Sequence, residues 1–168
     1  MGWFDDRERD DGYTAFVRSA SPALGRTAWF LTGDVHAAEE LVQATLVKLY
    51  VAWPRIRRGE ELAYARRTLV NTSTDTWRKR RRERLTDETP ERPTPAGTRV
   101  EDRDELVRLL QELPEQQRRV VVLRYYSDLS EQGVADVLGI SVGAVKSAAS
   151  RGLARLRTHL ETPKEGLS

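Results

Sequence analysis

The sequence lacks cysteine, and this absence excludes disulfide bonds, cysteine-ligated zinc and thiol catalysis. It has two histidines, His36 and His159, which lie in different halves of the chain, so we expect no histidine-based metal site. No apolar run approaches the ~20 residues of a membrane span, and the acidic first residues contain no signal-peptide stretch. We therefore expect a cytoplasmic protein with no membrane insertion, no metal and no other cofactor.

The chain as a whole has little excess charge of either sign, since its net charge is +2. This small total hides strong local differences. Residues 62–84 carry eight basic and two acidic residues, and residues 141–159 carry four basic residues and no acidic one. Between them, residues 85–105 carry seven acidic and three basic residues. Two basic segments joined by an acidic one favour a polyanionic partner bound at two places. Ordinary solvated faces remain the alternative at this point.

Strict alternation of apolar and polar residues is also nearly absent, whereas helical spacing recurs along the chain. Gly33 suits a helix C-terminus and Asp34 the next N-cap, and Pro114 is well placed to open a later helix. The run VVVLRYY has strand propensity, but its flanks favour a helix. The pattern predicts an all-α protein of one or two small domains, with helices over residues 13–31, 35–53, 60–84, 103–113 and 115–126.

The segment Glu131–Ser150 has the pattern of a helix-turn-helix. Gly139 lies where the turn needs a left-handed residue, Ala135 is small where the helices cross, and Ser130 and Ser141 suit the two N-caps. Gly133 lies within the first helix, and the sequence offers no physical reason for it. The core of the motif is predicted to contain Val134, Leu138, Ile140, Val145 and Ala148.

In a helix-turn-helix the second helix enters the DNA major groove with its N-terminal end first. Its outward face here is small, polar and basic, and it continues as a positively charged helix suited to phosphate contacts. A helical hairpin that contacts protein is the alternative reading. The residues that we expect to contact DNA are Ser141, Val142, Gly143, Lys146, Ser147, Ser150, Arg151 and Arg155, with Arg157 adding charge.

A second nucleic-acid face is predicted on the helix over residues 60–84. One side of this helix combines an aromatic ring, an amide and several guanidinium groups at helical spacing, and Tyr64 is suited to stack on an unpaired base. The preceding loop carries Arg57 and Arg58 beside Gly59 and is suited to hold an extruded base. A solubilising helix end is the alternative reading. The expected helix residues are Tyr64, Arg67, Asn71, Thr74, Arg78 and Arg82.

The helix over residues 35–53 presents a different outer face, with His36, Glu39, Glu40, Gln43 and Val47. Because its carboxylates would repel phosphates, we expect this face to turn away from DNA and to serve as a protein-docking surface. An ordinary wet surface is the alternative reading.

Three segments resemble the extracytoplasmic-function (ECF) sigma factors, the small initiation subunits of bacterial RNA polymerase. HAAEELVQATLVKLYVAWPRI resembles region 2.2, AYARRTLVNTSTDTWRKRRR resembles regions 2.3 and 2.4, and the segment from LPEQQRRVVVLRYY to ARLR resembles region 4. The resemblance implies an all-α, non-enzymatic transcription initiation factor that binds core RNA polymerase and recognises promoter DNA. It further implies that the polymerase β′ clamp helices and β flap, and an anti-sigma factor, are partners.

The resemblance also implies a division of labour along the chain. Residues 1–84 form a three-helix region 2 domain for polymerase docking and −10 recognition, residues 85–102 an extended linker, residues 103–160 a region 4 domain for −35 recognition, and residues 161–168 a tail. The polymerase-binding residues carried over are Glu39, Glu40, Leu41 and Gln43. A stand-alone helix-turn-helix regulator with a helical sensor domain remains the alternative function.

Overall fold

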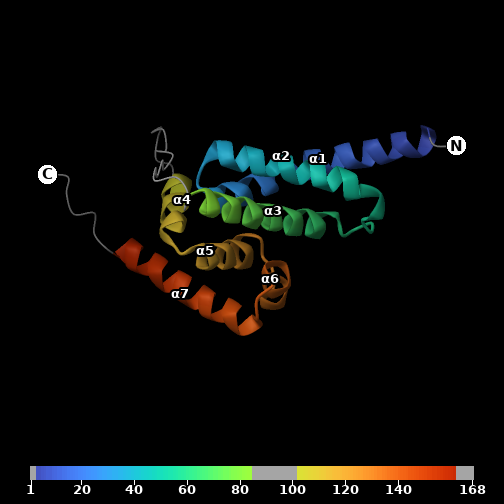
Figure 1. Cartoon of the computed structure of the whole chain (residues 1–168). Coiled ribbons are helices and arrows are strands. Elements are labelled where there is room, and N and C mark those ends of the chain that lie inside the picture. Colours follow the sequence, from blue (N-terminus) through green and yellow to red (C-terminus); the bar gives the residue numbers. More distant parts are fainter. Residues whose placement is uncertain (1–2, 85–101, 162–168) are drawn as a thin grey trace. The chain divides into compact units, whose positions relative to one another are not determined.

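A computed structural model describes residues 3–84 and 102–161, and these residues form helices without any β-strand (Figure 1). The expected all-α class is therefore confirmed. The chain divides into two compact units, residues 1–95 and 96–168. Most of the predicted acidic linker lies outside the described residues.

The first unit is built from α1 (Trp3–Thr32), α2 (Val35–Ala52) and α3 (Glu61–Arg84), with the short 3₁₀ helix η1 (Trp53–Arg55) after α2. Each of the three long helices contacts the other two. Leu24, Leu49 and Leu69, one from each helix, are fully buried where these helices meet. The apolar side of each helix therefore points into one shared core.

The turn between α1 and α2 follows the local chemistry that the sequence predicts. Gly33 adopts a left-handed backbone conformation with φ of 73°, which glycine reaches without a Cβ clash. The side chain of Asp34 accepts a hydrogen bond from the His36 backbone N–H at 2.8 Å and so caps α2.

Helix α1 begins at Trp3, ten residues before the predicted start at Tyr13. Its first half contacts α2. The Tyr13 hydroxyl donates a hydrogen bond to the Leu46 carbonyl oxygen at 2.8 Å. The Tyr50 hydroxyl donates to Asp10 at 3.0 Å and accepts from Arg9 at 3.2 Å. These contacts join residues more than 30 positions apart, so periodicity within the acidic segment could not reveal them.

The second unit contains α4 (Asp102–Glu112), α5 (Glu115–Val121), the π-helical stretch η2 (Val122–Tyr126), α6 (Glu131–Leu138) and α7 (Val142–Glu161). Helix α4 is shifted by one residue from the predicted 103–113. The run VVVLRYY is helical, as its flanks indicate. Val120, Leu123, Val134 and Val145 are fully buried and form the core of the unit.

Local residues shape the helix-turn-helix as predicted. Gly139 ends α6 in a left-handed conformation with φ of 67°. Ser130 Oγ accepts from the Gly133 N–H, and Ser141 Oγ accepts from the Ala144 N–H, both at 3.0 Å. A Cβ on Gly133 would lie 3.2 Å from the capping Ser130 Oγ, so a larger residue there would require the cap to shift by a few tenths of an ångström. The predicted core residues Val134, Val145 and Ala148 are buried, whereas Leu138 and Ile140 are half-buried.

A cluster of charged side chains lies near the start of α5. The Glu115 carboxylate forms an ion pair with Arg119 at 2.9 Å and a second one with Arg118, and all three side chains are no more than 15% exposed. Burial, followed by the neighbouring Arg119 cation, lowers the pKa of Arg118 to about 10. One carboxylate therefore holds two nearly buried cations within the unit.

Candidate nucleic-acid interface

The predicted basic face of α3 lies on the surface of the first unit. Ala65, Leu69 and Ser73 point into the core, and the helical repeat therefore turns the opposite side outward. The Thr74 side chain is half-buried and its hydroxyl donates to the Val70 carbonyl oxygen at 2.9 Å. The remaining expected residues are exposed, namely Tyr64, Arg67, Asn71, Arg78 and Arg82.

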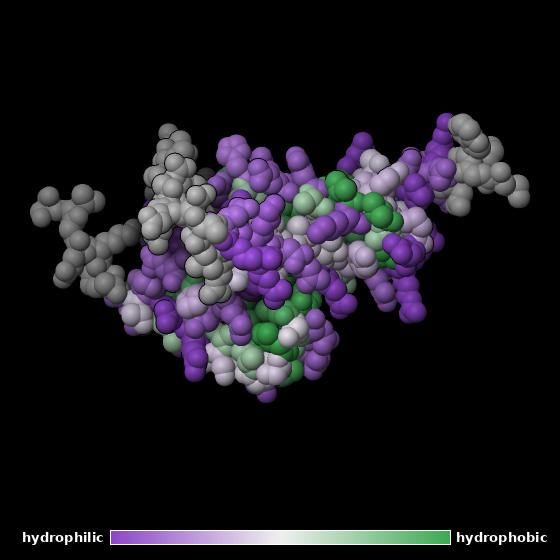
Figure 2. Space-filling view, in the orientation of Figure 1, coloured by the Kyte–Doolittle hydropathy of each residue, from purple (hydrophilic) through white to green (hydrophobic). Residues whose placement is uncertain are grey.

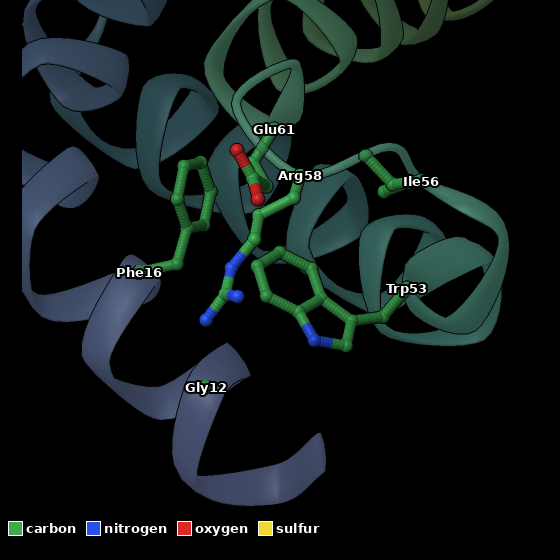
Figure 3. Close-up of a pocket in the computed structure, with 6 residues that line it drawn as sticks. All are labelled: Gly12, Phe16, Trp53, Ile56, Arg58 and Glu61. Carbon is green, nitrogen blue, oxygen red and sulfur yellow. The ribbon is translucent and has the colours of Figure 1, made fainter. Parts of the chain in front are cut away.

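Residues of the loop before α3 line a hollow in the surface of the first unit that the sequence did not predict. Arg58 lines this hollow together with the rings of Phe16 and Trp53 (Figure 3). Gly59 has φ of 92°, and its N–H donates to a Glu61 side-chain oxygen at 2.8 Å. Gly12, Ile56 and Glu61 complete the lining. Two aromatic rings beside a guanidinium form a surface on which a flat, electron-rich group can stack.

The nearby Arg57 side chain is exposed and does not line the hollow. Phe16 comes from α1 and Trp53 from η1, so the hollow depends on how α1 crosses the end of α2. The rings of Phe16 and Trp53 lie 5.4 Å apart, centre to centre. The sequence spacing does not predict a contact between these two residues. Each is nevertheless noticeable, because the chain has few aromatic residues.

The outward side of α7 has the predicted character. Val145 and Ala148 are buried against the rest of the unit, and Val142 is half-buried. Ser141 is exposed, but its hydroxyl already caps the helix. The other expected residues are exposed and share the side away from the core, namely Gly143, Lys146, Ser147, Ser150, Arg151 and Arg155.

A shallow hollow lies beside this face, between the start of α5 and the first half of α7. Ser147 and Arg151 line it from α7, and Pro114, Gln116 and Gln117 line it from the other side. The α5 residues were not among those expected from the sequence. Their amide side chains add hydrogen-bonding groups next to the basic face.

The outer face of α2 is exposed at His36, Glu39, Glu40 and Gln43, and it carries two carboxylates and no lysine or arginine among these four residues. Leu41 differs from its expected neighbours, because it is 6% exposed and belongs to the core of the unit. Its side chain therefore supports the face from beneath and is not available for docking.

Towards the C-terminal end of α2 the surface becomes apolar. Val47 and Val51 are 65% and 68% exposed, and they lie one helical turn apart. Figure 2 shows hydrophobic surface over this end of the helix. The acidic and amide-bearing face of α2 therefore continues into exposed valines at the C-terminal end of the helix.

Both units match models of one protein family. Residues 16–83 match the model described as "Sigma-70 region 2", and residues 103–156 match the model described as "Sigma-70, region 4". These matches fall on the two compact units, one on each.

Individual relatives agree with these models. The chain is 39% identical over 151 residues to an RNA polymerase sigma-E factor of Streptomyces coelicolor. This match covers 88% of this chain and 85% of the relative. It is 30% identical over 156 residues to the ECF RNA polymerase sigma factor EcfG of Rhodopseudomonas palustris. This match covers 90% of this chain and 83% of the relative.

Among solved structures, the chain is similar to the sigma factor RpoE of Bartonella quintana, crystallised with the anti-sigma factor NepR. The TM-score is 0.75 at 26% sequence identity, and the match covers 91% of this chain and 99% of RpoE. Within residues 3–84 and 102–161, no helix is both long enough and apolar enough to span a membrane.

Proposed function

The chain belongs to the ECF sigma factors of RNA polymerase, and from its two exposed basic helices we propose that the first unit binds the −10 element of a promoter and the second unit the −35 element. As a member of this family, it directs RNA polymerase to promoters. The family consists of non-enzymatic transcription factors, so RNA polymerase carries out the chemistry of transcription.

Helix α7 is the proposed reader of the −35 element. Its first two turns combine the small residue Gly143 with Lys146 and Ser147, so the backbone can approach base edges while a cation reaches a base acceptor. Arg151 and Arg155 follow on the exposed side and are suited to hold phosphates on either side of the groove. The residues proposed for this role are Ser141, Val142, Gly143, Lys146, Ser147, Ser150, Arg151 and Arg155.

Helix α3 and the loop before it are the proposed site for the −10 element. Arg67 and Arg78 lie on the exposed face and are suited to bind backbone phosphates, while Tyr64 offers a ring for stacking. Extruding a base from a duplex costs a few kcal/mol, which stacking and pocket contacts offset. The proposed residues are Arg57, Arg58, Tyr64, Arg67, Asn71, Thr74, Arg78 and Arg82.

The exposed face of α2 is the proposed docking site for the β′ clamp helices of core polymerase. Glu39, Glu40 and Gln43 supply its polar groups, and Leu41 is buried beneath them. We assign the β flap to the second unit. Docking at both places would hold the two DNA-binding faces at a fixed separation and convert two weak contacts into one bivalent contact.

The proposed domain limits are residues 1–84 for polymerase docking and −10 binding, 85–102 for the linker, 103–160 for −35 binding and 161–168 for the tail. An anti-sigma factor is a further proposed partner, since RpoE of Bartonella quintana was crystallised with one at 26% identity to this chain. Because core polymerase acts in the bacterial cytoplasm, we place the protein there.

Promoter selection by reconstituted holoenzyme tests this function. We expect the Lys146→Ala/Arg151→Ala double variant to lose transcription from promoters that depend on a −35 element, and Gln43→Ala to weaken binding to core polymerase. We also expect the free chain to bind promoter duplex weakly and the holoenzyme to bind it tightly. Normal promoter selection by the double variant would contradict the assignment of α7, and tight sequence-specific binding by the free chain would support a stand-alone regulator.

A further inference from the structure

An ion pair joins the two helices of the helix-turn-helix. The Lys146 ammonium on α7 lies 3.7 Å from the Glu131 carboxylate, which belongs to the first residue of α6. The two side chains are 64% and 40% exposed, so both are open to solvent and to a bound molecule. The cation that we propose as a reader of base edges is thus paired, before it meets DNA, with a carboxylate from another helix.

The position of Glu131 gives this pair an effect on DNA binding. In a helix-turn-helix the first helix crosses the DNA backbone while the second lies in the groove. A carboxylate at the start of the first helix therefore approaches phosphates, which repel it. The repulsion is weakest while Lys146 stays close, and it grows when the ammonium moves away to contact a phosphate.

From this geometry we propose that Glu131 is a positioning residue that confers specificity on −35 recognition. It holds the Lys146 ammonium over the groove and disfavours phosphate contacts that would otherwise bind any sequence. On a matched −35 element, Lys146 donates to base acceptors in the groove, and this contact compensates for the weakened ion pair. On other sequences no such compensation exists. The inference rests on the proposed role of α7 in −35 binding.

A purely structural role for Glu131 predicts different results. An acidic residue in the first turn stabilises a helix through its dipole, and its loss would lower stability and all DNA affinities together. The proposed role instead predicts that nonspecific affinity rises, even though loss of the dipole interaction lowers stability slightly. The two roles therefore differ in the sign of one measurable change.

The test compares holoenzyme binding to a matched promoter duplex and to a duplex with a scrambled −35 element. We expect Glu131→Gln to raise affinity for the scrambled duplex by about two- to fivefold, because this is the change in affinity that the free energy of one exposed ion pair produces. We also expect the variant to steepen the salt dependence of this affinity. Affinity for the matched duplex changes less, so the ratio of the two affinities falls. Glu131→Asp keeps the charge and restores most of this ratio.

Asp136→Asn is the matched control. Asp136 is an exposed carboxylate on the same helix, and it accepts a hydrogen bond from Gln132 at 2.9 Å. The control removes the same unit of charge from α6 without touching Lys146, so we expect the affinity ratio of the wild type. In a Lys146→Ala background, Glu131→Gln loses its effect on the ratio.

Each result separates the inference from the function on which it rests. If Lys146→Ala weakens −35 use but Glu131→Gln leaves the ratio unchanged, the inference is overturned and the function of α7 stands. Equal effects of Glu131→Gln and Asp136→Asn also overturn it, because net charge alone would then explain them. If Lys146→Ala leaves −35 use intact, the proposed function of α7 fails and the inference fails with it.

Discussion

A Cβ atom built on Gly152 of α7 would lie 2.7 Å from the Cγ2 atom of Val121 on α5. That separation is too short for two carbon atoms, so the two helices can approach this closely only because residue 152 has no side chain. We expect Gly152→Ala to lower the free energy of unfolding of the second unit by about 1–2 kcal/mol, since overpacking outweighs the higher helix propensity of alanine.

The positions of the tryptophans allow the unfolding of the two units to be followed separately. Trp3, Trp29, Trp53 and Trp77 all belong to the first unit. In urea unfolding, Gly152→Ala should therefore move the circular dichroism transition of the second unit and leave tryptophan fluorescence unchanged. Gly25→Ala is the control, because no atom lies within 4 Å of a Cβ there, and we expect it to stabilise the first unit by about 0.5–1 kcal/mol. Equal stability of Gly152→Ala and wild type would contradict the close-packing argument.

The sequence was sufficient where structure depends on neighbouring residues. Gly33 and Gly139 have the left-handed conformations that their positions predicted, and Asp34, Ser130 and Ser141 cap the helices that follow them. Each of these features involves residues at most three positions apart. The propensities and capping rules that describe such features require no knowledge of the tertiary fold.

The sequence was insufficient where distant residues meet. Within the part of α1 that the sequence did not predict, Arg9 and Asp10 contact Tyr50 of α2. The family resemblance placed Leu41 among the polymerase-binding residues, but resemblance by position does not show which way a side chain points, and Leu41 is in the core. The pairing of Glu131 with Lys146 depends on how two helices cross. None of these contacts has a local signal.

Tyr13 gives the first unit a dependence on alkaline pH. Burial, followed by the interaction with Tyr50, raises the pKa of the Tyr13 phenol. The folded state then binds the phenol proton more tightly than the unfolded state, so the contribution of Tyr13 is complete below about pH 10 and is lost as pH rises through the higher folded pKa. We expect Tyr13→Phe to remove this decline above about pH 10.

The same variant loses the hydrogen bond from the hydroxyl to Leu46, which lowers stability by about 1 kcal/mol below that pH. Urea unfolding followed by tryptophan fluorescence between pH 8 and pH 11 measures both effects. Tyr125→Phe is the control, because this ring lies in the second unit and is 55% exposed. An identical decline in stability for wild type and Tyr13→Phe would contradict the assignment.

Glu115 holds together the nearly buried charges of the second unit. Its carboxylate pairs with both Arg118 and Arg119, and burial already lowers the pKa of Arg118 to about 10. Replacing the carboxylate by a neutral amide leaves two adjacent cations without its compensating charge. We expect Glu115→Gln to lower the free energy of unfolding of this unit by about 3–5 kcal/mol, as when one partner of a buried ion pair is removed.

Circular dichroism during urea unfolding measures this change. Asp6→Asn provides the comparison, because the Asp6 side chain is 69% exposed and lies 3.8 Å from Arg9. An exposed pair of this kind contributes at most about 1 kcal/mol. If the two variants lost equal stability, burial of the Glu115 cluster would not be the cause of its importance.

The exposed arginines of α3 are expected to determine the salt dependence of −10 binding. Arg67 and Arg78 lie on the same outward face, and each is suited to neutralise one phosphate. Replacing either one with alanine in the holoenzyme should reduce the slope of log affinity against log salt by about 0.7–0.9, and replacing both should reduce it by about twice as much. Asn71→Ala should weaken binding without changing the slope, because an amide releases no counterion.

Arg26→Ala is the control for loss of charge outside this face, because Arg26 is an exposed arginine of α1. If Arg26→Ala changed the slope as much as Arg67→Ala, net charge and not the α3 face would account for phosphate binding.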